Sequence, residues 1–165
     1  MPTTLRKADR SRAYSLLQSA IALTIMAIGI LLLVPRLNTI IEEAWRAHVK
    51  SVATSLKTGA MIYREAWITD PQSTLLTGMA MSDDGWPVGT VKENGSGVMS
   101  TARCEGLWNR LLDKEVPTLS VRRNTGADFR VEVVEERCRY YHTASGDRFF
   151  IDYDTAHGRV SWNIR

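Results

Sequence analysis

The chain lacks most of the residue patterns that catalysis and metal binding require. It has two cysteines and three histidines in 165 residues, and the histidines show no metal-ligand spacing. The sequence contains no Cys-x-x-Cys pair, no glycine-rich phosphate loop and no Ser/His/Asp order. We therefore expect neither an enzyme nor a cofactor or metal site, and we expect a structural or binding protein.

The main body of the chain also lacks an excess of either charge. Residues 1–13 hold four basic residues and one acidic residue, and the remaining residues carry 17 of each sign. A nucleic-acid-binding domain would need a basic stripe on the domain itself. We therefore expect no nucleic-acid partner. Basic residues next to an apolar segment instead favour the cytoplasmic side of a membrane.

One long run has no charged residue at all. Tyr14–Val34 comprises 21 residues, which as a helix span roughly 30 Å, the thickness of a hydrocarbon core. A cleaved secretory signal, the alternative, would have a shorter apolar core and a small-residue cleavage site after it. The run ends in LLLVPRLN instead. We predict a retained transmembrane helix over residues 14–35.

The helical pattern continues beyond Pro35. Apolar residues recur at steps of three and four, with charged residues largely between them. This predicts one helix from about Ser15 to Trp67, kinked near Pro35 because a proline removes one helical hydrogen bond. Leu56 and Tyr63 are predicted core residues of a domain that packs on the second half of the helix.

Three apolar residues come directly after the span. Leu37, Ile40 and Ile41 lie where a monomer offers no domain to cover them. We predict that neighbouring helices in an assembly would cover them.

The rest of the chain predicts an α+β domain. Residues 68–100 are rich in turn residues and are predicted to form a loop, in which Trp86 either makes an exposed contact or pins the loop to the domain. A short helix is predicted over 102–114, capped by Ser100 or Thr101. Short alternating strands over 128–164 predict a four-stranded antiparallel sheet, with the long helix packed on it.

Several charged residues of the domain carry no specific prediction. Asp152 and Asp154 on a strand, and Asp83-Asp84 at a turn, are interpreted as solvated residues, with calcium binding as the alternative. Arg122-Arg123 and Glu135-Glu136 are interpreted as solvated faces.

Both cysteines lie downstream of the span, on the side opposite the basic arm. If that side is oxidising, Cys104 and Cys138 are expected to form a disulfide. It would close a loop of roughly 34 residues and stabilise the fold by about 3–4 kcal/mol. Two free buried thiols are the alternative.

The arm and span together resemble the class III signal of type IV pilins and type II secretion pseudopilins. In that family a short basic leader ends in a small residue, and a prepilin peptidase cuts there before a segment similar to F-T-L-I-E. Here Ala13 precedes Tyr14, and the next residues are Ser15, Leu16, Leu17 and Gln18. Pro35 is the 22nd residue of the resulting mature chain, a position where the family often has a helix-kinking proline.

Parts of the globular region resemble the mannose-sensitive haemagglutinin pilin branch. The matching segments are Gly85-Trp86-Pro87, Cys104-Glu105-Gly106-Leu107-Trp108-Asn109, Cys138-Arg139-Tyr140-Tyr141, Ile151-Asp152-Tyr153 and Gly158-Arg159-Val160.

The resemblance implies a type IV pilin fold and a defined topology. Residues 1–13 would be a leader, and residues 36–165 a periplasmic domain on a single-pass inner-membrane helix. The implied partners are the prepilin peptidase, an assembly ATPase with its platform protein, and other pilin subunits, which bundle their helices into a filament (fimbrium) used for adhesion or surface attachment.

Two residues depart from the family pattern, and the second of them favours a minor pilin. Ala13 stands where the family usually has glycine, and Gln18 stands where it usually has glutamate. That glutamate is thought to pair with the free amine of a neighbouring subunit, since a carboxylate in lipid needs a partner. Gln18 would pair more weakly, or it would simply lie near the lipid head groups. A pseudopilin of a type II secretion system and a membrane-tethered periplasmic binding module remain alternatives.

Overall fold

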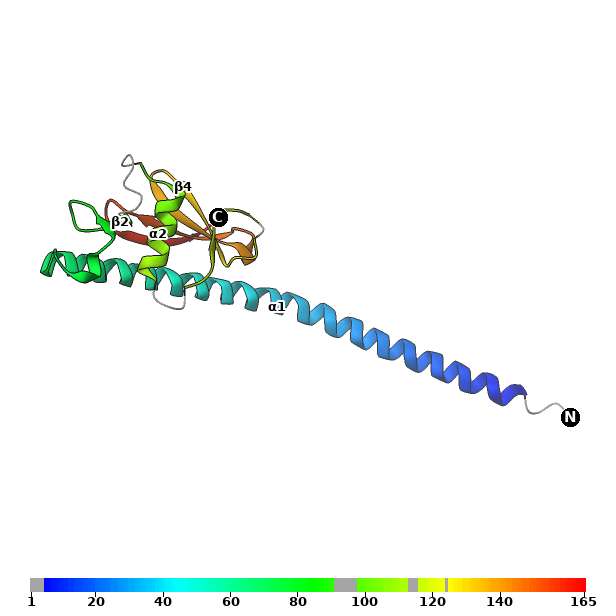
Figure 1. Cartoon of the computed structure of the whole chain (residues 1–165). Helices are drawn as coiled ribbons and strands as arrows, with labels where there is room; N and C mark the ends of the chain where they lie inside the picture. Colours follow the sequence, from blue (N-terminus) through cyan, green and yellow to red (C-terminus); the bar gives the residue numbers. More distant parts are fainter. Residues whose placement is uncertain (1–4, 91–97, 113–115, 124) are drawn as a thin grey trace. The chain divides into compact units, whose positions relative to one another are not determined.

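The computed structural model describes residues 5–90, 98–112, 116–123 and 125–165, with side chains from residue 18 onward except at residue 35. It contains two compact units, residues 1–43 and residues 44–165. Helix α1 (Leu5–Thr69) makes up the described part of the first unit and begins the second (Figure 1).

α1 begins earlier than the sequence predicts. The sequence predicts a helix from about Ser15, but the backbone is helical from Leu5. Leu, Lys, Arg and Ala are good helix formers, and an existing helix extends without a new nucleation step. The helix is not interrupted at Pro35, and the kink expected there stays a prediction.

The second half of α1 has one buried face. Val49, Val52, Leu56, Ala60 and Tyr63 are buried, at the helical spacing that the sequence predicts. The helix ends at Thr69, two residues beyond the expected end, and the Asp70 side chain accepts a hydrogen bond from the backbone of Gln72. Leu56 and Tyr63 are confirmed as core residues.

The segment predicted as a loop contains ordered elements. A short 3₁₀ helix, η1 (Thr74–Leu76), precedes a hairpin of β1 (Met79–Met81) and β2 (Pro87–Thr90). The loop prediction for residues 68–100 is therefore wrong over these elements. Strands of three and four residues are too short to show a reliable alternation in the sequence.

Helix α2 (Thr101–Leu111) is close to its predicted position. The Ser100 hydroxyl accepts a hydrogen bond from the backbone N–H of Arg103 at 3.2 Å, so Ser100 is the N-cap. The helix ends three residues before the predicted boundary.

The main sheet has five strands in the order β3-β4-β5-β6-β7. The four predicted antiparallel strands are β4 (Phe129–Val134), β5 (Arg137–His142), β6 (Phe149–Asp154) and β7 (Arg159–Ile164). A fifth strand, β3 (Leu119–Ser120), pairs parallel to β4. The expected four-stranded antiparallel sheet is therefore corrected to a mixed five-stranded one.

The parallel strand depends on one local anchor. Asp128 accepts hydrogen bonds from both the backbone N–H and the hydroxyl of Thr118, at 2.9 and 2.8 Å. The backbone of Phe129 donates to the carbonyl of Thr118 at 2.9 Å. A two-residue strand held in this way gives no periodic signal in the sequence.

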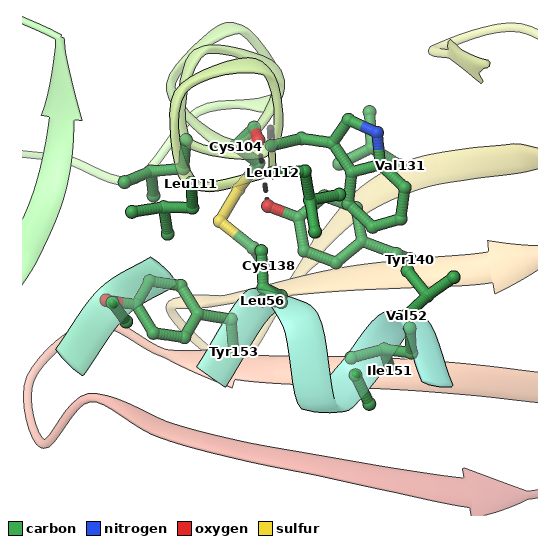
Figure 2. Packing of buried hydrophobic residues seen from close by; sticks show 14 of the residues in the cluster. Val52, Leu56, Cys104, Leu111, Leu112, Val131, Cys138, Tyr140, Ile151 and Tyr153 are labelled. Atoms are coloured by element: carbon green, nitrogen blue, oxygen red, sulfur yellow. Dashed lines mark hydrogen bonds between the residues drawn. A yellow bond between two sulfur atoms is a disulfide. The ribbon is translucent and has the colours of Figure 1, made fainter. Parts of the chain in front are cut away.

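One face of the sheet and both helices share a single core. Side chains of α1, α2 and the central strands meet there, and Figure 2 shows Leu56, Cys104, Tyr140 and Ile151 among them. Cross-strand partners Val131, Tyr140 and Ile151 are on the same face, as the register requires. The domain is thus an α+β layer structure, as predicted.

The turn between β4 and β5 is made of two glutamates with left-handed backbone angles. Glu135 and Glu136 have φ of 50° and 62° and connect the paired residues Val134 and Arg137. A two-residue hairpin turn with positive φ at both positions favours Asn-Gly and is costly for glutamate.

We expect the double substitution Glu135→Asn with Glu136→Gly to stabilise the domain by about 1 kcal/mol, because the new residues adopt these angles with less strain. Chemical denaturation of the full chain in detergent measures the change. The control, Glu135→Gln with Glu136→Gln, removes the same two charges but keeps the strain. Equal stability of the two variants would contradict the explanation.

Candidate membrane and assembly helix

The first unit exposes a large apolar surface. In the most apolar 18-residue window of α1, mean hydropathy is 2.3 and no residue is buried. Its large side chains are at least 48% exposed; they are Ile21, Leu23, Ile25, Met26, Ile28, Ile30, Leu31, Leu32, Leu33 and Val34. Apolar surface of this extent marks a contact with lipid or with other protein. Within the described residues, this is the one helix long and apolar enough to cross a membrane.

The predicted cleavage site lies in the first turns of α1. The backbone at Ala13 and Tyr14 is helical, and their side chains lie outside the described residues. The Pro35 side chain also lies outside the described residues. Gln18 is described, and its side chain is exposed. The roles assigned to these residues stay predictions.

The predicted assembly residues are uncovered. Leu37, Ile40 and Ile41 are 52%, 59% and 43% exposed. They lie three and four residues apart, so they share one side of the helix. They continue the apolar surface of the span toward the second unit.

The exposed side of α1 in the second unit is mostly polar, unlike the apolar surface of the first unit. Its exposed residues include Ser51, Thr54, Ser55 and Thr58. The hydroxyls of Thr54 and Thr58 donate to backbone carbonyls one turn earlier, at 2.8 and 3.0 Å. These residues border a groove of about 570 Å³ beside the end of α2. Small side chains of this kind permit close approach of another helix.

Trp86 pins the β1–β2 turn to the domain. Its indole is half-buried, and the Arg64 guanidinium of α1 lies 4.4 Å from the ring centroid. Gly158, in the β6–β7 turn, lies so close to the ring that a Cβ there would overlap it. The neighbouring Gly85 packs against Trp67 in the same way. Of the two alternatives for Trp86, the structure favours pinning the loop.

The two cysteines form the predicted disulfide. Cys104 in α2 and Cys138 in β5 are fully buried, with Cα atoms 5.4 Å apart (Figure 2). The Tyr140 hydroxyl donates to the carbonyl oxygen of Cys104 at 2.8 Å. Burial raises the pKa of Tyr140, so this phenol stays protonated and keeps its hydrogen bond.

Two histidines meet in an aromatic cluster. The rings of His48 and His142 are 5.6 Å apart, and Phe129 contacts both. Burial lowers the pKa of His142, and the nearby His48 lowers it further. Asp128 acts in the other direction and raises the pKa. The buried Nδ1 of His142 has no hydrogen-bond partner in the described part of the chain. These features favour a neutral core histidine.

The outer face of the sheet carries a set of ion pairs. Arg139 binds Asp152 through two hydrogen bonds of 2.6 and 2.8 Å, which raises the pKa of Arg139. Arg130 contacts Asp147 at 3.0 Å and Glu132 at 3.1 Å. Asp152 is buried under its arginine, so its interpretation as a solvated residue is wrong. Among the described residues, no group of three potential ligands could hold a metal ion.

No family model, curated protein or solved structure matches the chain.

Proposed function

We propose that this chain is a type IV pilin-like subunit, a minor pilin similar to the haemagglutinin-pilus branch. One observation carries the proposal. A single helix exposes large apolar side chains from Ile21 to Val34 and at Leu37, Ile40 and Ile41, and then has a buried face in a disulfide-closed α+β domain. A subunit that waits in a membrane and later bundles with others needs both halves.

The proposed sequence of events begins at the leader. The prepilin peptidase removes residues 1–13 on the cytoplasmic side of the inner membrane, between Ala13 and Tyr14. An assembly ATPase and its platform protein then move the subunit into a filament. The apolar surface leaves its contact with lipid and packs against the helices of neighbouring subunits. Close packing between the helices drives this transfer. The periplasmic domain stays folded throughout and serves as a structural part of the filament.

Leader removal tests the proposal directly. We expect co-expression of the full chain with a prepilin peptidase to yield a mature protein that begins at Tyr14, as measured by intact mass and N-terminal sequencing. Replacing Ala13 with leucine should abolish the cut, because the site requires a small residue. Ala8→Leu, which alters the same arm away from the cut, is the matched control. Retention of residues 1–13 would contradict the proposal.

The alternatives differ in the fate of the arm and of the mature chain. A tethered binding module would keep its arm. A type II secretion pseudopilin would lose it, but would not be recovered in filaments sheared from the cell surface. Recovery of the mature chain in such filaments supports the pilus subunit.

A further inference from the structure

A second surface of the domain has the features of a ligand site. A hollow of about 590 Å³ lies where the β6–β7 turn meets α1 and the pinned Trp86. Its volume is within the usual range for small-molecule pockets, roughly 300–1,000 Å³. The side chains that line it include three cations: Lys57 from α1, Arg137 from β5 and Arg159 from β7.

These three cations have no partner of their own. In the part of the chain that the structure describes, Lys57, Arg137 and Arg159 form no ion pair or hydrogen bond through their side chains. Arg159 is in cross-strand register with Asp154. Asp154, however, already contacts the ring of His157.

The carboxylates of the hollow are already engaged. Asp152 is held by the two hydrogen bonds from Arg139. Asp154 accepts from the backbone N–H groups of Ala156 and His157, at 3.0 and 3.3 Å, and lies 3.0 Å from the His157 ring nitrogen. The three unpaired cations therefore give the hollow a net positive charge, and an anionic group is the complement.

The remaining lining selects among anions. Met61, Val160 and the indole of Trp86 supply apolar surface, and Ser161 supplies a hydroxyl. A paired carboxylate keeps free lone pairs, so Asp152 and Asp154 still accept hydrogen bonds from a ligand. The hollow thus offers cations, hydrogen-bond acceptors and an apolar surface together.

We propose that this hollow binds an acidic saccharide. Carboxylates on different sugar units lie against Arg137 and Arg159 of the sheet and against Lys57 of α1. The hydroxyls of the saccharide donate to Asp154 and form a hydrogen bond with Ser161, and its C–H groups contact Met61 and Val160. An inorganic anion would use the cations alone, whereas an acidic saccharide also brings hydroxyl donors for Asp154 and C–H groups for the apolar lining. The proposal does not depend on the proposed function.

Calorimetric titration of the full chain in a neutral detergent tests the site. The probes are trigalacturonate, the neutral galactotriose and inorganic phosphate. We expect saturable binding of trigalacturonate that weakens as salt is added. Arg159→Gln and Lys57→Gln should each weaken it roughly tenfold. Lys50→Gln, which removes an exposed lysine from the same helix outside the hollow, is the control.

Four results would overturn the proposal. They are no saturable binding of trigalacturonate, equal binding of the neutral sugar, equally tight binding of phosphate, and an equal loss in Lys50→Gln. Circular dichroism of each variant confirms that the fold is retained. Cleavage after Ala13 is measured independently, so failure of one proposal leaves the other intact.

Discussion

Gly59→Ala is expected to lower the free energy of unfolding of the domain by about 2 kcal/mol. At Gly59 the backbone of α1 passes against the C-terminal end of α2. A Cβ built on Gly59 would overlap the carbonyl oxygen of Leu111 and lie 2.9 Å from its carbonyl carbon. These are backbone atoms, which cannot rotate away as a side chain can. The two helices would have to separate.

The intrinsic helix preference of alanine acts in the opposite direction. Alanine is favoured over glycine by about 1 kcal/mol in a helix interior, less than the cost of forcing the two backbones apart. Guanidinium denaturation of the full chain in detergent, followed by near-ultraviolet circular dichroism, measures the net effect.

Gly29→Ala is the matched control, since a Cβ at Gly29 has nothing within 4 Å. It introduces the same residue into the same helix and should leave the denaturation midpoint of the domain unchanged. An unchanged midpoint in Gly59→Ala as well would show that the two helices do not approach so closely.

Replacing both Cys104 and Cys138 with alanine is expected to cost more, about 3–4 kcal/mol. The bridge joins residues 34 apart in sequence and connects α2 to β5, so its removal frees a long loop in the unfolded chain. Both sulfur atoms are also buried, and their loss leaves space in the core. This is a large part of the roughly 5–15 kcal/mol by which a domain is stable.

Tyr140→Phe provides the comparison for the disulfide. It removes the hydrogen bond to the Cys104 carbonyl but keeps the bridge, and should cost about 1 kcal/mol. Reduction should destabilise the natural chain and leave the double alanine variant unaffected. A double variant no less stable than Tyr140→Phe would show that the bridge contributes little beyond the packing of α2 on β5.

The candidate membrane and assembly helix could be predicted because its signals are local. An uncharged run of sufficient length, continued by a three- and four-residue repeat, specifies the apolar helix and the buried face around Leu56 and Tyr63. The alternation of strands β4–β7 is equally local. The exposure of Leu37, Ile40 and Ile41 was predicted from their position directly after the uncharged span.

The elements that could not be predicted depend on contacts between distant segments. Strand β3 is held by Asp128, ten residues from Thr118. The Glu135-Glu136 turn contains no glycine or asparagine, so sequence-based turn rules do not detect it. The pairing of Asp152 with Arg139 requires the register of β5 and β6. None of these is visible as a pattern along the chain.

Composition and periodicity alone specified the apolar helix, the amphipathic continuation, the α+β class and the availability of two cysteines for a bridge. Each of these features depends only on the residues of one segment, so it can be recognised without knowing where that segment lies in the fold. The close passage at Gly59, the pinning of Trp86 and the gathering of Lys57, Arg137 and Arg159 around one hollow arise only in the folded domain. They depend on how the helices dock on the sheet, because docking alone brings residues far apart in the chain within contact distance.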